Sequence, residues 1–197
     1  MIKVVAFNGS PREKGNTALS LGLVTAELEK EGIQTETISL SGQNLSGCVA
    51  CGKCFENKNQ CCVITSDLLN TYAAKMFEAD GILLGSPVYY ADITANLKAL
   101  IERCGYVAGA NGGLLVRKVG AGVIAVRRGG AIHSFDTINH LFLISQMIIP
   151  GSRYWNMTIG RDPGEVLNDQ EGVKTMEILG QNMAWLLKKL HPEKALQ

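Results

Sequence analysis

The sequence lacks an excess of charge, a basic cluster and any long apolar run. Its 197 residues include 19 basic and 18 acidic side chains, so the net charge is near zero. Without a polybasic arm or a basic helical stripe, electrostatics does not favour nucleic acid or an anionic membrane as a partner. The longest apolar stretch, residues 141–149, is interrupted by Ser145 and Gln146 and is too short to span a bilayer. We therefore expect neither nucleic acid nor a membrane as a partner.

An export signal is also lacking, because the first residues do not run from charged to apolar to small side chains. Unpaired cysteines without such a signal indicate a reducing, cytoplasmic location and argue against a disulfide framework. The length suits one domain of ordinary size with a substantial core. We therefore expect a single domain over residues 1–197, without internal repeats or low-complexity linkers.

Apolar runs alternate with segments of helical periodicity along the whole chain. The expected strands are 2–7, 35–40, 81–85, 119–126 and a short segment near 148. The expected helices are 17–31, from 66 or 67 to about 78, 94–104, about 134–147 and 170–189. Strands that are apolar on every residue, alternating with helices, predict an α/β fold: a doubly wound parallel sheet of five strands. In the strand order 2-1-3-4-5, the ligand crevice opens beyond the first and third strands, at residues 8–16 and 86–92.

Against this background, five of the six cysteines are concentrated in a single loop at residues 47–65. Cys48, Cys51 and Cys54 have strict Cys-x-x-Cys-x-x-Cys spacing, and Cys61 and Cys62 follow. Three thiols at intervals of three residues can converge on one side of a compact turn, and a fourth completes the set that an iron-sulfur cubane requires. The favoured interpretation of the loop is therefore a [4Fe-4S] cluster.

Other interpretations of the loop remain open. Structural zinc usually has two ligand pairs separated by a longer insertion, which this loop does not show. A Cys-x-x-Cys redox dithiol and a loop that holds no metal are both compatible with the spacing. Neither Cys61 nor Cys62 precedes proline, so the run is not a standard ferredoxin motif.

A second motif, Gly9 to Thr17, leads from the first strand into the first helix. Free backbone N–H groups at such a helix N-terminus form an anion site, to which Ser10, Asn16 and Thr17 add donors and Arg12 adds positive charge. The spacing fits neither a Walker A loop nor Gly-x-Gly-x-x-Gly. This favours a monophosphate such as that of FMN, while a capped helix without ligand is the simpler alternative.

Together, GSPREKGNT, SPVYY after the third strand and VRRGG after the fourth resemble the flavodoxin-like, NADPH-dependent FMN reductase family. With CVACGKC and CCVI between them, the chain resembles the iron-sulfur flavoprotein branch of that family. The resemblance covers essentially the whole chain. Members of the family typically have two acidic residues after Cys-Val-Ile, whereas CVITSD here has only Asp67.

The resemblance implies three groups of FMN-binding residues and one set of cluster ligands. The FMN phosphate would be held by Ser10, Arg12, Asn16 and Thr17, the isoalloxazine by Pro87, Val88, Tyr89 and Tyr90, and its pyrimidine end by Arg127, Arg128, Gly129 and Gly130. The cluster ligands would be Cys48, Cys51, Cys54 and Cys62, although the doubled cysteine leaves Cys61 as an alternative fourth ligand.

The chemistry of these residues agrees with the resemblance. A tyrosine at 89 or 90 can offer the flavin an aromatic face, and an arginine at 127 or 128 can stabilise the anion of reduced flavin. Exposed or structural roles would also explain these tyrosines and arginines.

No Ser-His-Asp set, catalytic carboxylate pair or Cys-His nucleophile is evident, so we expect no catalytic side chain and chemistry that resides in the cofactors. The expected function is an FMN-dependent oxidoreductase that passes electrons between the loop-bound cluster and FMN. A cluster-free NAD(P)H-dependent FMN, quinone or metal reductase is the alternative. NADPH or NADH is a possible substrate, and a small-molecule electron acceptor or a ferredoxin-like electron donor is the expected partner. The resemblance suggests a homodimer or a homotetramer.

Overall fold

The fold is an α/β sandwich in three layers, described for residues 1–195 by a computed structural model. The strands are β1 (Lys3–Asn8), β2 (Gln34–Ser39), β3 (Gly81–Pro87), β4 (Val119–Val126) and β5 (Met157–Ile159). The helices are α1 (Asn16–Lys30), α2 (Lys53–Asn57), α3 (Leu69–Glu78), α4 (Ala95–Ala110), α5 (Ala131–Ile144), α6 (Gln170–Leu190) and α7 (Pro192–Ala195), with a 3₁₀ turn η1 (Glu165–Asn168). All strand pairs are parallel and the order is β2-β1-β3-β4-β5, which confirms the predicted fold class.

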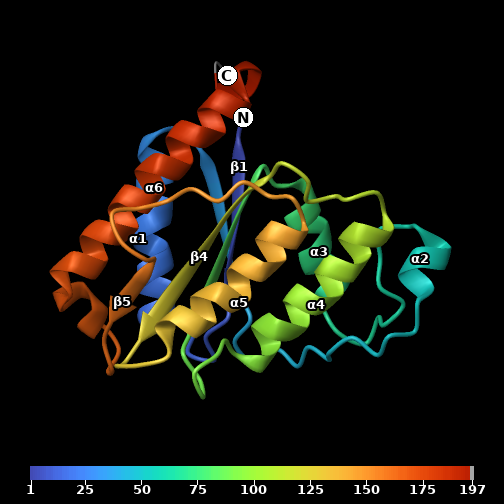
Figure 1. Ribbon diagram of the computed structural model, residues 1–197, viewed down its shortest axis with the longest axis horizontal. Helices are drawn as coiled ribbons and strands as arrows, with labels where there is room; N and C mark the ends of the chain where they lie inside the picture. Colours follow the sequence, from blue (N-terminus) through green and yellow to red (C-terminus); the bar gives the residue numbers. More distant parts are fainter. Residues whose placement is uncertain (196–197) are drawn as a thin grey trace.

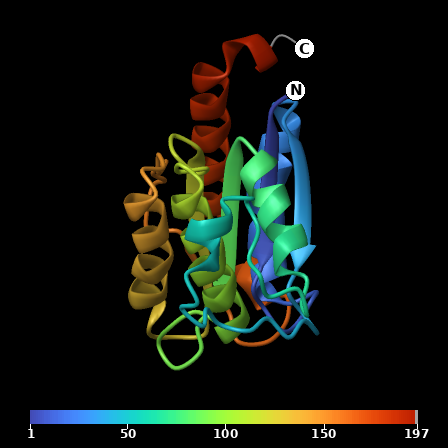
Figure 2. The same cartoon turned by 90° about the vertical axis from the view of Figure 1, so that its right-hand side faces the viewer.

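Two apolar cores, one on each face of the sheet, explain this arrangement. α1 and α6 cover one face, and α3, α4 and α5 cover the other (Figures 1 and 2). All eight residues of β4 are buried, as a strand covered on both faces requires. Each face therefore removes a separate set of aliphatic side chains from water.

The predicted fifth strand is wrong. Ile148 forms only an isolated bridge with Val119, and the fifth strand of the sheet is formed by Met157–Ile159, which pairs with Ile124 to Val126 at the other end of β4. The chain leaves the sheet at Pro150, whose ring nitrogen cannot donate a ladder hydrogen bond. It returns seven residues later at Met157, and the apolar run near 148 only touches the start of β4.

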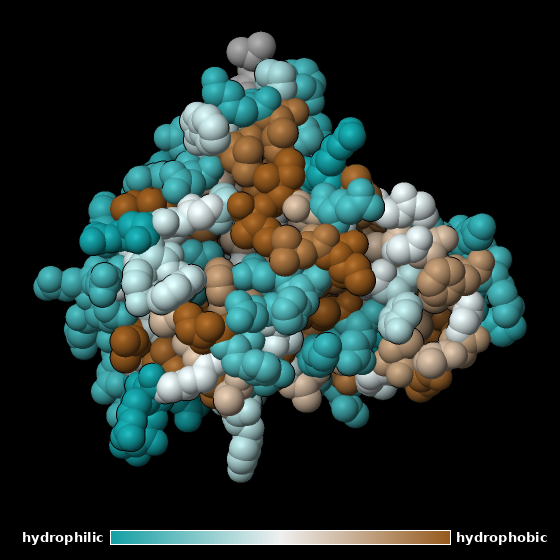
Figure 3. Space-filling view, viewed as in Figure 1, coloured by the Kyte–Doolittle hydropathy of each residue, from teal (hydrophilic) through white to brown (hydrophobic). Residues whose placement is uncertain are grey.

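No helix among residues 1–195 is both long and apolar enough to cross a membrane. The apolar surface is instead local. Figure 3 shows a band of it near the carboxyl end of α5, where Leu143 is 64% and Ile144 84% exposed.

Candidate functional site

The loop after β1 is folded back on itself by Asn8, a residue that is 1% exposed. The Asn8 Oδ1 accepts a hydrogen bond from Ser10 N at 3.1 Å, and its Nδ2 donates to Glu13 O at 3.1 Å. Ser10 Oγ in turn accepts from Arg12 N at 3.1 Å. The amide of Asn8 therefore holds the two sides of the Gly9–Gly15 turn together before α1 begins.

The N-terminus of α1 is open to a ligand. Its cap residue, Gly15, has no side chain that could accept the first-turn N–H groups, and the first turn has no acidic residue. Thr17 in that turn is 1% exposed, whereas Arg12 on the preceding loop is exposed to solvent. Uncapped N–H groups at the positive end of the helix dipole favour an anion here.

Asn16 has a structural role that the sequence did not indicate. Its Nδ2 donates to Asp162 O at 3.0 Å, and its Oδ1 accepts from Gly164 N at 2.8 Å. The side chain thereby ties the segment after β5 to the start of α1. Since an amide nitrogen carries two protons, one N–H of Asn16 stays free for a ligand.

The loops after β1 and β3 are in direct contact. Gly9 N donates to Gly85 O at 2.8 Å, and Thr94 Oγ1 donates to Gly9 O at 2.7 Å. Thr94 N donates to Ser86 Oγ at 3.1 Å. The two loops expected to form the crevice therefore lie side by side at the carboxyl ends of these strands, at the lower edge of the sheet in Figure 1.

A tight turn follows β3. Tyr89 N donates to Asp92 O at 2.8 Å and Asp92 N to Tyr89 O at 3.0 Å, with φ of 49° at Tyr90 and 63° at Ala91. Two positive φ values in succession normally call for Asn or Gly. The ring of Tyr90 lies at the turn tip in solvent, and that of Tyr89 is 48% exposed. Such strain in non-glycine residues is common at binding sites.

Gly130, after β4, lets this turn approach closely. Its φ is 89°, and a Cβ built on it would lie 2.8 Å from Ala91 Cα and 3.0 Å from Val88 Cγ1. Arg127, Arg128 and Gly129 are exposed on the same loop. The segments expected to line the flavin, Pro87–Tyr90 and 127–130, therefore share one edge of the sheet with the phosphate loop.

Asp92 is an acidic residue in the turn after β3. Burial raises its pKa, but hydrogen bonds from Ile93 N and Thr137, together with the nearby His133, outweigh burial and keep the pKa below its usual range. His133 Nε2 lies 3.6 Å from Asp92 Oδ2. The carboxylate thus joins the turn after β3 to α5.

The cysteine loop runs between β2 and α3 and packs against α4 (Figure 2). Cys48, Cys51, Cys54 and Cys62 line one cavity of about 190 Å³, together with Arg103 and Tyr106 of α4. Cys61 is exposed and lies outside that lining. All six cysteines are free thiols.

Cys62 is held much more firmly than its neighbour. Its N–H donates to Asn70 Oδ1 at 2.8 Å, Asn70 Nδ2 donates to its carbonyl at 2.9 Å, and its Sγ accepts from Arg103 Nε at 3.4 Å. Cys61 makes a backbone bond to Asn59 Oδ1 at 3.2 Å. This difference distinguishes Cys62 from Cys61, which the resemblance left as an alternative fourth ligand.

Within residues 1–195, no group of three or more His, Cys, Asp or Glu side chains is close enough to hold a single metal ion. Because each cysteine of a Cys₄ set binds a different iron of a cubane, the sulfurs surround a volume and need not meet at one point. The donor set at the cavity, four thiols beside a buried arginine, has the chemistry of such a site.

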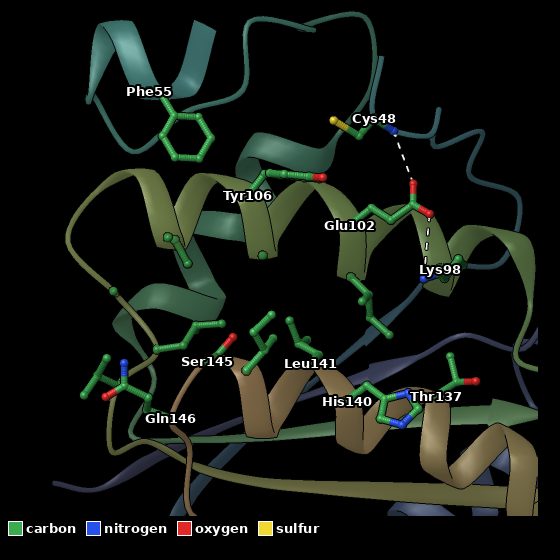
Figure 4. A pocket seen from close by; sticks show the side chains of 18 of the residues that line it. Cys48, Phe55, Lys98, Glu102, Tyr106, Thr137, His140, Leu141, Ser145 and Gln146 are labelled. Carbon is green, nitrogen blue, oxygen red and sulfur yellow. Dashed lines mark hydrogen bonds and ion pairs between the residues drawn. The ribbon is translucent and has the colours of Figure 1, made fainter. Parts of the chain in front are cut away.

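A larger cavity, about 1140 Å³, lies between α4 and α5 (Figure 4). One end is lined by Cys48 and Phe55 of the cysteine loop, and the other by Asp92 and His140. Figure 4 shows Glu102 of α4 between the N–H of Cys48 and Lys98. The cavity therefore borders both the cysteine loop and the turn after β3.

Residues 2–162 match the family described as NADPH-dependent FMN reductase. An iron-sulfur flavoprotein of Methanocaldococcus jannaschii is 38% identical over 95% of this chain and 98% of its own length. The chain belongs to this family. It is an iron-sulfur flavoprotein of the NADPH-dependent FMN reductase family, and thus a flavin-dependent oxidoreductase.

Two other proteins are consistent with this membership. The iron-sulfur flavoprotein of Methanosarcina thermophila is 31% identical over 95% of this chain and 96% of its own. The WrbA-like flavodoxin of Agrobacterium tumefaciens, a solved structure, superposes with a TM-score of 0.66 at 15% identity, covering 95% of this chain and 97% of that one. The second comparison shows the flavodoxin-like fold.

Sequence reasoning missed three residues of this flavoprotein: Asn8, Asn70 and Arg103. A polar residue at the end of an otherwise apolar strand was the available signal for Asn8. Asn70 and Arg103 lie on helices with ordinary polar positions, so nothing in the sequence marked them.

Proposed function

We propose that this flavoprotein binds FMN at the carboxyl edge of its sheet and a [4Fe-4S] cluster in the cysteine loop, and passes electrons between them. The observation that carries the proposal is the common cavity lined by Cys48, Cys51, Cys54 and Cys62. FMN exchanges electrons singly or in pairs and a cluster exchanges one at a time, so the two cofactors together couple hydride-type and one-electron chemistry.

The FMN phosphate is assigned to the turn before α1. Ser10, Asn16 and Thr17 supply polar side chains, Arg12 supplies charge, and the uncapped first turn of α1 supplies backbone N–H groups. Support comes from the absence of a cap and of acidic residues in the first turn of this described helix.

The isoalloxazine is assigned to the carboxyl edge of the sheet, beside the loops after β3 and β4. Pro87, Val88, Tyr89 and Tyr90 line one side, and the loop of Arg127, Arg128, Gly129 and Gly130 lies on the other. The exposed arginines would stabilise the negative charge that reduced flavin carries at its pyrimidine end.

The cluster ligands are assigned to the three cysteines of the Cys-x-x-Cys-x-x-Cys run and to Cys62. Support for Cys62 over Cys61 is its place at the cavity and its three hydrogen bonds. The electron donor is NAD(P)H or a ferredoxin-like protein, the acceptor is a small molecule, and the protein acts in the cytoplasm as a dimer or tetramer.

The test is the iron, sulfide and flavin content of protein purified without oxygen. We expect FMN and a cluster in wild type. Cys62→Ser should lose iron while keeping FMN, because the flavin loops are separate segments, and the adjacent Cys61→Ser should keep both. Wild type that holds FMN but takes up no iron and sulfide on reconstitution would replace this proposal with a cluster-free reductase. Iron loss in Cys61→Ser with retention in Cys62→Ser would reverse the ligand assignment.

A further inference from the structure

Arg103 is a buried cation directly below the cysteine loop, in the middle of α4. Its side chain is 1% exposed. The guanidinium donates from Nε to Cys62 Sγ at 3.4 Å, from Nη1 to Ser46 O at 3.2 Å and to Asp67 Oδ2 at 2.5 Å, and from Nη2 to Ile64 O at 3.0 Å. One side chain thus uses all three of its nitrogens on the loop.

These contacts reach both ends of the loop. Ser46 lies just before the loop, Cys62 and Ile64 lie near its end, and Asp67 follows it. A planar guanidinium has five N–H donors in a rigid fork, so it can join several chain segments in a way that the single ammonium of lysine cannot. The helix α4 is packed into the core, so these hydrogen bonds connect both ends of the loop to a buried helix.

The positive charge is maintained despite burial. An arginine guanidinium is not deprotonated in proteins, and the charge of Arg103 is paired with Asp67, whose Oδ2 accepts from Nη1 at 2.5 Å. Asp67 is 7% exposed and also accepts from Leu69 N and Ser46 N. A buried ion pair of this kind adds little net stability compared with apolar packing, but removal of one partner leaves a buried charge unpaired.

We propose that Arg103 is the positioning residue of the cluster site: it holds Cys62 at the cavity as the fourth thiolate, and its Nε–H directed at Sγ favours the reduced cluster. The inference rests on the proposed function. Reduction adds one negative charge to the cluster and its thiolates, and a charged donor to a ligand sulfur stabilises that state and raises the reduction potential.

The test compares Arg103→Gln, Arg103→Lys and Asp67→Asn with wild type, and uses Arg153→Gln, an exposed arginine far from the loop, as control. In metal-free protein, amide hydrogen exchange over residues 46–67 reports the loop directly. We expect exchange at least tenfold faster in Arg103→Gln and unchanged in Arg153→Gln, with FMN binding preserved in both.

In the iron-loaded protein, Arg103→Gln should bind iron about 10–100-fold more weakly, as is typical when a partner of a metal ligand is lost. Its reduction equilibrium should shift about tenfold toward the oxidised cluster, or about 59 mV for a one-electron couple. The iron affinity and reduction potential of Arg103→Lys should lie between those of wild type and Arg103→Gln, because lysine keeps the positive charge but lacks the forked guanidinium. Asp67→Asn should shift the potential upward, since it removes the counter-charge.

If Arg103→Gln fails to fold, two other variants test the role of Arg103 by the same measurements. They are Arg103→Lys and the double variant Arg103→Gln/Asp67→Asn, which removes both buried charges. Suppose that wild type binds its cluster and that the Arg103 variants show unchanged loop exchange, iron affinity and midpoint potential. This result would overturn the inference but leave the proposed function intact. A wild type that takes up no iron would overturn the proposed function and this inference together.

Discussion

The adjacent glycines Gly129 and Gly130 provide the sharpest test of the flavin edge. A Cβ on Gly130 would meet Ala91 Cα at 2.8 Å and Val88 Cγ1 at 3.0 Å, and its φ is 89°. A Cβ on Gly129 would meet nothing within 4 Å, and its φ is not left-handed. Gly130→Ala therefore pushes on the turn after β3, while Gly129→Ala adds the same methyl group to open space.

The structure predicts different changes in the free energy of unfolding for the two variants. For Gly130→Ala, the left-handed backbone costs roughly 1–2 kcal/mol and displacement of the Ala91 backbone about 1–3 kcal/mol. The free energy of unfolding should fall by about 2–5 kcal/mol. Gly129→Ala should be neutral or raise it by up to about 1 kcal/mol, because alanine restricts the unfolded chain.

Urea unfolding of the FMN-free proteins measures these free energies, and flavin titration measures the consequence for binding. FMN should bind more weakly to Gly130→Ala, since the displaced turn carries Tyr89, and equally well to Gly129→Ala. Equal stabilities of the two variants would refute the close approach of the loops. A destabilised Gly130→Ala with the affinity of wild type would refute the placement of the isoalloxazine at this turn.

Three further predictions concern charged groups. Arg12→Ala should remove a charge-assisted bond of about 1.5–3 kcal/mol and weaken FMN binding about tenfold or more without changing the stability of the FMN-free protein; equal affinities on titration would reject the phosphate assignment. At least one of Arg127→Ala and Arg128→Ala should lower the FMN midpoint potential in a redox titration. An unchanged potential in both variants would place this loop away from the pyrimidine ring. Burial raises the pKa of Asp80, but the hydrogen bond from Lys194 and other partners lower it overall. The stabilisation of the folded protein by this carboxylate is therefore present above the unfolded pKa of about 3.9 and is lost as pH falls through the folded pKa. Asp80→Asn should therefore be less stable than wild type at pH 7, and urea unfolding should show the difference shrinking below pH about 4; a difference independent of pH would contradict the pKa direction.

The parts of the fold that the sequence predicted well are those governed by local pattern. The strand 119–126 was predicted with the bounds that β4 has, because eight buried apolar residues between Lys118 and Arg127 leave little choice. The strand near 148 was wrong for the complementary reason. An apolar triplet before Pro150 looks like a strand, but pairing depends on where the chain returns to the sheet, which no local pattern encodes.

In the candidate site too, local motifs were predictable from the sequence and long-range contacts were not. Motif spacing selected the cysteine loop and the turn before α1 as candidates, and the family resemblance favoured Cys62 as the fourth ligand. Spacing could not show that Asn16 also binds the segment at Asp162, which is far away in sequence. Nor could it show that Arg103 is buried, because an arginine in a helix normally indicates an exposed position until another segment covers it.

One helix connects the two candidate cofactor sites. Thr94, the cap residue of α4, donates to Gly9 O in the loop after β1, and Arg103, nine residues later, donates to Cys62 in the cysteine loop. At 1.5 Å per residue the two positions are roughly 13 Å apart along the helix axis. Because α4 is packed into the core by Leu97, Leu100 and Cys104, this spacing cannot vary much without unfolding the helix. The fold thereby holds the cysteine loop and the loop after β1 in a fixed relation, which is what the proposed exchange of electrons between their cofactors would require.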